Sequence, residues 1–302
     1  MASRIKLRAW AKTRRIVVAV ALSVFLSACG QQKPASNESD ASTSGPTSPS
    51  GATAALDPRL HQPFADATIS DPPEGWLRPP DTTMTGQSVG KLYTEVRNHW
   101  DDIRFVSPAG KPLAFWATLD TEMGEIEITL LPELAPNHVR SFVALAQAGY
   151  FDGLVFERII HEESGDGKLE LIEAGCPVGT GEVGYGSIGY WMKPEIHSAL
   201  LHEEGTVGAS HGEGKDTAAC KFYITLNKCP FMDGEYTVFG KVTQGLGAAR
   251  KIFSLPVRDD SEFPEGDRPV KPVVIRKVTI HTREESGIRS QESENTNHNP
   301  GS

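Results

Sequence analysis

Arg158 is the residue whose setting most strongly suggests chemistry. It lies in VFERII, residues 155–160, a mostly apolar stretch that reads as a buried strand. A guanidinium group is never deprotonated in a protein and holds its donors in a rigid fork, so a fixed arginine can present a permanent positive charge to a substrate. The alternative is an ordinary salt bridge between Arg158 and a neighbouring carboxylate.

Histidine and cysteine spacings give no support for a metal site. HEES at His161 and HEEG at His202 place histidine beside acids, but neither has the HExxH spacing of a zinc protease helix. Cys176, Cys220 and Cys229 show no CxxC or other zinc spacing. We therefore expect no metal and no cofactor.

Eight short strand patterns separated by turn residues predict a closed β-barrel, so the fold class is mainly β. The expected strands are residues 115–119, 125–131, 155–160, 168–174, 206–209, 222–226, 238–242 and 274–280. Two helices are expected between them. One lies within residues 137–150 and stops at Gly149, and the other lies near residues 246–255.

An additional segment, residues 56–112, precedes the barrel pattern. Its prolines predict an irregular first half, in which Phe64 and Trp76 are available to dock on something larger. Later apolar residues at spacings of three and four predict one amphipathic helix with a packing face. That face consists of Val89, Leu92, Val96, Trp100 and Ile103. The sequence leaves open whether this N-terminal extension packs on the barrel or covers a pocket.

Several separated motifs occur in an order that resembles the cyclophilin-type peptidyl-prolyl isomerases. They are LAPNHVRSFVALAQAGYFDGLVFER, GTGEVGYGSIGYWMKPEIH and FMDGEYTVFGKV, and the resemblance covers residues 115–280. It implies an eight-stranded antiparallel barrel closed by two helices over residues 113–283. It also implies binding of X-Pro peptides and isomerisation of the X-Pro bond.

The resemblance assigns a role to Arg158. In the family's Phe-His-Arg strand motif this arginine contacts the prolyl peptide; here Phe156 is retained as a substrate-binding position and Glu157 replaces the histidine. Rotation about an X-Pro bond is slow because amide resonance must be lost, with a barrier on the order of 20 kcal/mol. A cationic donor that favours the twisted amide lowers this barrier without a nucleophile or a cofactor.

Other substrate-binding positions follow from the same resemblance. On the second strand, Leu171 and Glu173 stand at the family's methionine and glutamine, and Glu170 and Cys176 at its phenylalanine and aspartate. The intervening HEESGDGK predicts a longer loop beside the site.

Later in the chain, Ser210 and His211 occupy the stretch whose backbone pairs with the substrate. Lys221 replaces a glutamine, and Tyr223 replaces the pocket phenylalanine. The other substrate-binding positions by resemblance are Phe231 and Met232 at the apolar rim and floor, and Tyr236 in place of a histidine.

Two family amides have become an acid and a base, Glu173 and Lys221. We hypothesise that they pair across the site and hold Arg158 in place. The competing possibility is that Glu170 or Glu173 grips Arg158 directly and neutralises its field. The family fold also places Cys176 and Cys220 on strands that flank one face, where a disulfide between them is possible.

The first 28 residues predict an export signal, with six cations, no acid and then the apolar run IVVAVALSVFL. LSAC resembles the bacterial lipobox, which implies a lipid on Cys29; the alternative is an ordinary signal peptide with an accidental cysteine. Cleavage removes six cations and takes the net charge from −9 to −15, which disfavours nucleic acid as a partner. Polar residues 29–55 predict a disordered tether, and residues 284–302 a disordered tail.

Two hypotheses result. The first is a lipid-anchored isomerase at the bacterial cell envelope, facing the periplasm or the exterior, that acts on unfolded exported proteins. The second is a catalytically weak module that binds proline peptides or serves as a scaffold. Arg158 and the apolar pocket favour the first hypothesis, and the substitutions at Glu170, Glu173 and Lys221 favour the second.

Overall fold

The fold comes from a computed structural model. It describes residues 60, 62–72, 78–164, 167–182, 185–212, 214–258 and 268–284. All of these belong to the unit Asp57–Ser302. The predicted leader, Cys29, the tether, Trp76 and the tail after Glu284 lie outside the described residues.

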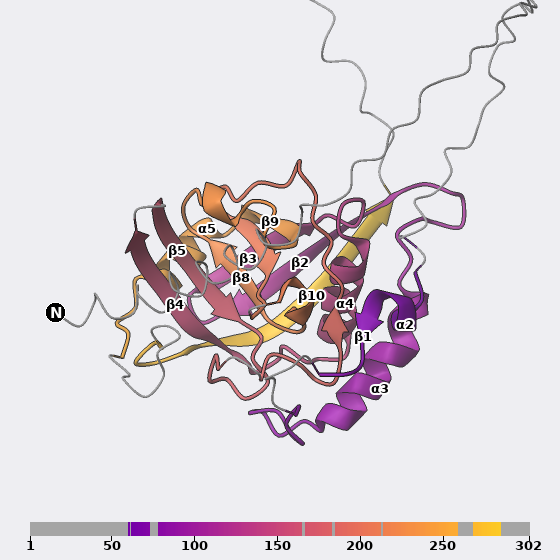
Figure 1. The fold of residues 1–302 in the computed structure, drawn as a ribbon, viewed down its shortest axis with the longest axis horizontal. Coiled ribbons are helices and arrows are strands. Elements are labelled where there is room, and N and C mark those ends of the chain that lie inside the picture. Colours follow the sequence, from indigo (N-terminus) through magenta and orange to yellow (C-terminus); the bar gives the residue numbers. More distant parts are fainter. Residues whose placement is uncertain are drawn as a thin grey trace, which may run out of the picture. The chain divides into compact units, whose positions relative to one another are not determined.

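Eight strands form a closed antiparallel barrel in the order β10-β2-β3-β9-β7-β8-β5-β4 (Figure 1). This confirms the predicted barrel. The barrel strands are β2 (Leu113–Thr121), β3 (Gly124–Leu130), β4 (Val155–Ser164), β5 (Gly167–Ala174), β7 (Thr206–Ala209), β8 (Phe222–Thr225), β9 (Val238–Gln244) and β10 (Val273–Glu284). The barrel closes where Val273 and Val274 of β10 pair with Phe156 and Val155 of β4.

The hairpin of β4 and β5 corrects one expectation. The polar stretch after Ile160 was expected to form a long loop beside the site, but the two strands continue to pair as far as Ser164 and Gly167. The additional residues therefore lengthen the hairpin. The same pairing places Arg158 opposite Glu173.

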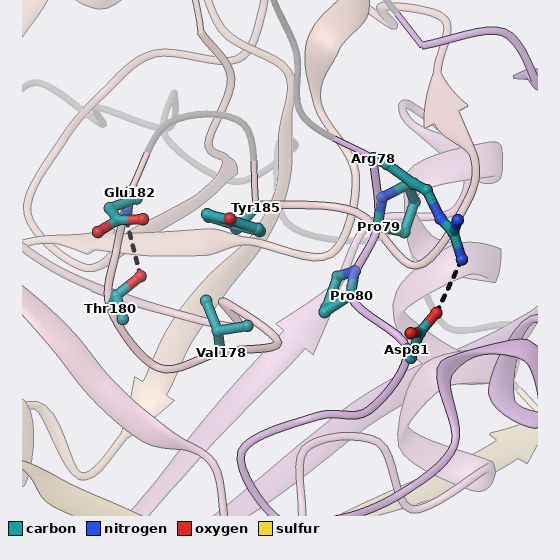
Figure 2. Close-up of a pocket in the computed structure, with 8 residues that line it drawn as sticks. All are labelled: Arg78, Pro79, Pro80, Asp81, Val178, Thr180, Glu182 and Tyr185. Carbon is teal, nitrogen blue, oxygen red and sulfur yellow. Dashed lines mark hydrogen bonds and ion pairs between the residues drawn. The ribbon is translucent and has the colours of Figure 1, made fainter.

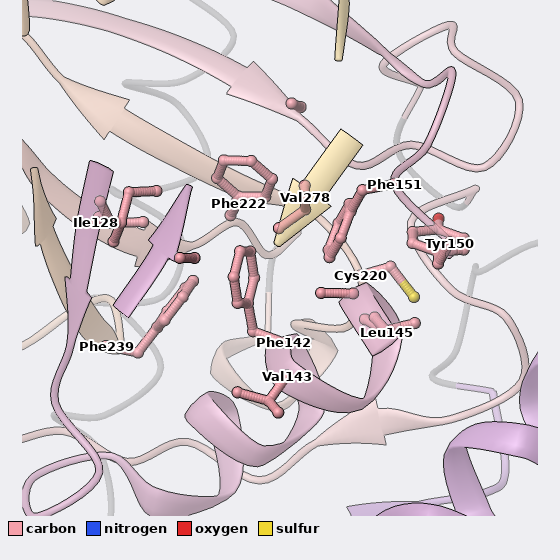
Figure 3. Close-up of a cluster of buried hydrophobic side chains, with 14 of the residues drawn as sticks. Ile128, Phe142, Val143, Leu145, Tyr150, Phe151, Cys220, Phe222, Phe239 and Val278 are labelled. Atoms are coloured by element: carbon pink, nitrogen blue, oxygen red, sulfur yellow. The ribbon is translucent and has the colours of Figure 1, made fainter. Parts of the chain in front are cut away.

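Two helices close the barrel, as predicted. Helix α4 (Pro136–Gln147) packs against β9 and β10, and α5 (Leu246–Phe253) packs against β3, β4 and β5. Phe142 of α4 lies in the core, with its ring centroid 5.1 Å from Phe151, 5.6 Å from Phe222 and 5.5 Å from Phe239 (Figure 3). Burial of such large rings is a main source of the barrel's stability.

The N-terminal extension packs on α4 and shares the barrel's core. It contains α2 (Phe64–Ala67), β1 (Thr68–Ile69), α3 (Val89–His99) and a single 3-10 turn, Trp100–Asp102. Strand β1 pairs with β6 (Trp191–Met192), and α3 contacts α4. The predicted apolar face is confirmed, because all five of its residues are buried.

Trp100 is the anchor of the extension. It is completely buried, its ring packs edge-on against Phe64 at 5.2 Å, and its Nε1 donates a hydrogen bond to the Gln62 carbonyl oxygen. The Arg140 guanidinium of α4 lies over the ring at 5.5 Å. The extension is thus part of the folded unit.

Cys176, Cys220 and Cys229 are all buried free thiols, so the possible Cys176–Cys220 disulfide is not formed. Within the described ranges, no group of three or more His, Cys, Asp and Glu residues could hold a metal ion. None of the described helices combines the length and apolarity needed to cross a membrane.

Candidate active site

Arg158 lies on strand β4, opposite Glu173 of β5. Its side chain lies between Glu173 and the loop that contains Gly181, and 15% of this side chain is exposed. Its Nη1 is 3.6 Å from Glu173 Oε1, an ion-pair distance that is too long for a hydrogen bond. On the loop side, Gly181 (φ +72°) packs so closely that a Cβ there would lie 2.7 Å from Arg158 Cγ. The arginine is therefore restricted by packing, and no bidentate carboxylate bridge from the described residues holds it.

Glu173 and Lys221 form the ion pair that the sequence proposed. Lys221 Nζ lies 2.6 Å from Glu173 Oε1, and both side chains are almost completely buried. The Ser210 hydroxyl also donates to Glu173 Oε2. Burial acts to raise the pKa of Glu173, but the charges of Lys221 and Arg158 outweigh it and hold the pKa below its ordinary value. Glu173 is thus ionised and directed mainly toward Lys221.

Glu157 is a second buried carboxyl group beside Arg158. Only 2% of the residue is exposed, and its Oε1 accepts a hydrogen bond from the Cys176 N–H at 3.0 Å. Burial, with a further contribution from the Glu173 charge, raises the pKa of Glu157 to about 8. The site therefore contains two carboxyl groups with opposite pKa shifts.

A separate apolar cluster lies next to these charges. Its buried members are Ile160, Leu171, Tyr223, Cys229 and Met232, and Leu169, Phe231 and Tyr236 pack against it. The predicted pocket residues Leu171, Tyr223, Phe231, Met232 and Tyr236 therefore do come together. Leu171, Tyr223 and Met232 are at most 5% exposed, so Phe231 and Tyr236 provide the accessible part of the cluster.

Tyr223 is held by a hydrogen-bonded chain that the sequence did not indicate. Its hydroxyl lies 2.7 Å from His202 Nε2, and His202 Nδ1 lies 2.9 Å from Asp233 Oδ1. Burial lowers the pKa of His202 despite the opposing effect of Asp233, so the imidazole is neutral. Nδ1 then donates to the carboxylate, and Nε2 accepts from Tyr223.

His211 and Tyr236 stack at the edge of the cluster, with ring centroids 4.1 Å apart. His211 Nε2 also lies 3.1 Å from the Glu235 carbonyl oxygen. Ser210, by contrast, points into the charged group, and its backbone N–H donates to the Lys221 carbonyl oxygen. The two neighbouring residues therefore serve different parts of the site.

Two sequence assignments change in the structure. Phe156 was expected to contact substrate, but it is completely buried in the main barrel core and has no accessible surface. Glu170 was one of two candidates to grip Arg158, yet its carboxylate pairs with Lys168 at 2.5 Å. The side chains alternate along a strand, so residues near Arg158 in sequence do not all share its face.

A cavity of about 490 Å³ lies beside this site, between the N-terminal extension and the Gly181 loop. Residues 78–81 line one wall, and Val178, Thr180, Glu182 and Tyr185 line the other (Figure 2). Thr180 and Glu182 flank the glycine that packs on Arg158. The described part of the extension thus contributes to the surroundings of the loop that packs on Arg158.

Two residues of the site had no clear signal in the sequence, namely Glu157 as a buried acid and Asp233, and the resemblance gave His202 only a packing role, which agrees with its burial. Glu157 stands at a register shift between Phe156 and Arg158, and such a shift turns a side chain away from its expected face. The bond between His202 and Tyr223 joins residues that are 21 positions apart. Spacing patterns in a sequence do not encode contacts of this kind.

Comparisons with known proteins agree with this geometry. Residues 116–280 match the family model described as cyclophilin type peptidyl-prolyl cis-trans isomerase/CLD. Peptidyl-prolyl cis-trans isomerase ppi1 of Schizosaccharomyces pombe is 36% identical over 160 residues, which are 53% of this chain and 95% of that protein. Peptidyl-prolyl cis-trans isomerase-like 3 of Gallus gallus is 35% identical over 164 residues, covering 54% and 94% of the two chains.

A solved structure of a cyclophilin type isomerase from Cryptosporidium parvum has 23% identity and a TM-score of 0.48, and covers 56% of this chain and 98% of that one. The family model spans more than half of the chain, and the relatives named above are isomerases matched over nearly their whole length. The protein is therefore an enzyme whose substrates are proline-containing peptides, and it belongs to the cyclophilin-type peptidyl-prolyl cis-trans isomerase family.

Proposed function

We propose that Arg158 is the catalytic residue of an isomerase that assists the folding of exported proteins. Its guanidinium group stabilises the prolyl amide as it twists, either at the pyramidal nitrogen or at the moving carbonyl oxygen. The Phe231 and Tyr236 side of the apolar cluster seats the proline ring, and His211 borders it. No covalent intermediate is needed, because only rotation about the amide bond takes place.

One observation carries this proposal. Arg158 is partly exposed, and its contact with Glu173 is a single one at 3.6 Å. Lys221 lies closer to the same carboxylate, at 2.6 Å, so it takes up most of the Glu173 charge. The positive charge of Arg158 is then available to a bound peptide, which argues against the neutralised arrangement.

The proposed substrates, exported proteins that are still unfolded, are inferred from the export signal in the first 28 residues. A charged segment, an apolar run and LSAC predict export with a lipid on Cys29, which places the enzyme at the bacterial cell envelope. We expect a Cys29→Ala variant to move from the membrane fraction to the soluble fraction, because the acyl anchor is lost. Cell fractionation followed by immunoblotting measures this. An unchanged membrane fraction would argue against lipidation at this residue.

The alternative function is a proline-peptide-binding module with weak catalysis. The buried state of Tyr223, Leu171 and Met232 favours it, because a closed cluster offers a shallow seat for a proline ring. A protein of this kind would bind X-Pro peptides without accelerating their isomerisation. Catalysis and binding therefore have to be measured separately.

The deciding experiment follows cis-to-trans isomerisation of a proline tetrapeptide with the full chain and with Arg158→Ala. We expect kcat/KM to fall by about a hundredfold in the variant, which corresponds to roughly 2.7 kcal/mol of transition-state stabilisation. Arg276→Ala is the matched control, because Arg276 pairs with Asp120 elsewhere on the barrel. Equal rates for the full chain and Arg158→Ala would favour the binding module.

A further inference from the structure

Glu157 is a buried acid for which the proposed mechanism has no use. It directly precedes Arg158 on β4, at the point where the pairing with β5 shifts between Phe156 and Arg158. Its Oε1 accepts the Cys176 N–H, whereas Oε2 is buried and has no hydrogen-bond partner among the described residues. An ionised carboxylate in that position would have an unsatisfied oxygen, which is costly in a buried site.

The backbone holds Glu157 and Arg158 together. The same Gly181 that packs on the Arg158 stem would, with a Cβ, lie 3.2 Å from Glu157 Cγ. One loop residue therefore limits the movement of both side chains. A change in the charge of Glu157 is therefore not relieved by free rotation of its side chain.

Four groups around Glu157 come from strand β5 and from segments next to β5, β8 and α4. Glu173 lies on β5, Lys221 precedes β8, Cys176 follows β5, and Tyr150 follows α4; each interacts electrostatically with the Glu157 carboxyl group. Of these, Glu173 is the anion and Lys221 the cation. They form one ion pair, so they leave the Arg158 charge uncancelled while Glu157 is protonated.

We propose that Glu157 is a positioning residue whose protonated form leaves Arg158 catalytically effective, and whose ionisation switches the isomerase to a slow state at alkaline pH. This inference rests on the proposed role of Arg158. An ionised Glu157 would make the group of four charges neutral and would compete with Glu173 for Lys221, which leaves more of the Glu173 charge acting on Arg158. Both effects weaken the field at the prolyl amide, since the interaction between buried charges is only weakly screened.

The titration of Glu157 supports this assignment. Burial raises its pKa to about 8, the Glu173 charge adds to this, and Lys221 and the Cys176 N–H act in the opposite direction. The carboxyl group is therefore mainly protonated at neutral pH and loses its proton just above it. The family histidine at this position has been replaced here by a group that titrates in a similar range but becomes negative rather than neutral.

The test is the pH dependence of kcat/KM from pH 6 to pH 9.5, measured on the full chain with an uncoupled tetrapeptide assay. We expect an about tenfold fall with a midpoint near 8 in the unmodified protein. Glu157→Gln, which keeps the shape and stays neutral, should show the low-pH rate at every pH. Glu204→Gln is the matched control, because Glu204 is partly exposed, pairs with Arg250 of α5 and should keep the unmodified profile.

Two further measurements distinguish titration of the Glu157 carboxyl group from titration of another group. A Cys176→Ser variant should keep the pH-dependent fall; a flat profile would assign the titration to the thiol and overturn the proposal. Isotope-edited infrared spectroscopy of the carboxyl groups, compared with Glu157→Gln if that variant folds, should show a protonated carboxyl band that disappears near pH 8. If no carboxyl group titrates above pH 7, the proposal is wrong.

The outcomes separate this inference from the proposed function. A rate that depends on Arg158 but is constant from pH 6 to pH 9.5 leaves the catalytic role of Arg158 intact and overturns the role of Glu157. A chain that does not accelerate isomerisation at any pH overturns both. A pH-dependent fall that persists in Glu157→Gln also overturns the role of Glu157.

Discussion

At the scale of single residues, the site is defined by charges that are buried yet compensated. Glu173 has three polar neighbours, Lys221, Arg158 and Ser210, which is why its pKa is lowered although burial alone would raise it. A buried ion pair adds little net stability when it is complete, but removal of one partner leaves a charge without compensation. The pair therefore acts mainly to fix the position of the side chains around Arg158.

This asymmetry gives a prediction for Lys221. Lys221→Gln leaves the buried Glu173 with the Ser210 hydrogen bond and the longer contact to Arg158 as its compensation, and we expect a loss of about 3–5 kcal/mol in the free energy of unfolding. Urea denaturation at pH 7 measures it. The double variant Glu173→Gln/Lys221→Gln, which has two amides, should recover most of the loss. Lys228→Gln, which breaks an exposed pair with Glu203, is the control and should leave stability unchanged.

At the scale of elements, a loop packs against strand β4 and limits the position of Arg158. The loop residue that packs on Arg158 is a glycine, Gly181. Gly181 has φ +72° and approaches both Arg158 and Glu157, so β4 and the loop can pack only because a Cβ is absent. Strand β4 has a register shift between Phe156 and Arg158, and the orientation of the Arg158 side chain also depends on the loop that packs on it.

Gly181→Ala should therefore lower the isomerase activity by more than its loss of unfolding free energy would cause. The new Cβ would stand 2.7 Å and 2.8 Å from Arg158 Cγ and Cδ, so the guanidinium group must move, and we expect kcat/KM to fall by about tenfold. Gly86→Ala is the matched control: it has a similar φ of +82° but nothing within 4 Å of the new Cβ. Both variants should lose about 1 kcal/mol or more of unfolding free energy from backbone strain. Equal activity in the two variants would contradict this account.

At the scale of the whole molecule, the barrel and the N-terminal extension share one hydrophobic core, so we expect them to unfold as one unit. Trp100 joins them, since it is completely buried between Phe64 of the extension and Arg140 of α4. The extension covers one side of α4 and forms one wall of the cavity beside Arg158.

Trp100→Ala tests this arrangement. Removal of a large buried ring should lower the free energy of unfolding by about 3–5 kcal/mol. Trp116→Ala is the control, because Trp116 is only partly buried and stacks on His281 on the barrel strands, so its loss should be clearly smaller. Denaturation followed by fluorescence and by circular dichroism should give one shared transition in the unmodified chain. Two separate transitions would show that the extension and the barrel are independent.

The sequence by itself determined the family, the eight strands, the two closing helices and the packing face of α3. These features are local: strand alternation, helical spacing and motifs follow from neighbouring residues. The sequence did not determine the opposition of Arg158 and Glu173, because the polar stretch between the two strands was expected to form a loop, and the register depends on where the hairpin turns. The ion pair between Glu173 and Lys221 could be predicted, because an acid and a base stand where the family has two amide side chains in the same site.

Only the tertiary structure decided how the site is filled. The position of Phe156 in the core, the bond from Tyr223 to His202 and the burial of Glu157 depend on contacts between distant segments and on one shift in strand pairing. Glu195 capping the first turn of α4 through the N–H groups of Asn137 and His138 is another such contact. Burial and charge depend on three-dimensional neighbours, so the protonation of Glu157 could be inferred only once the barrel was closed around it.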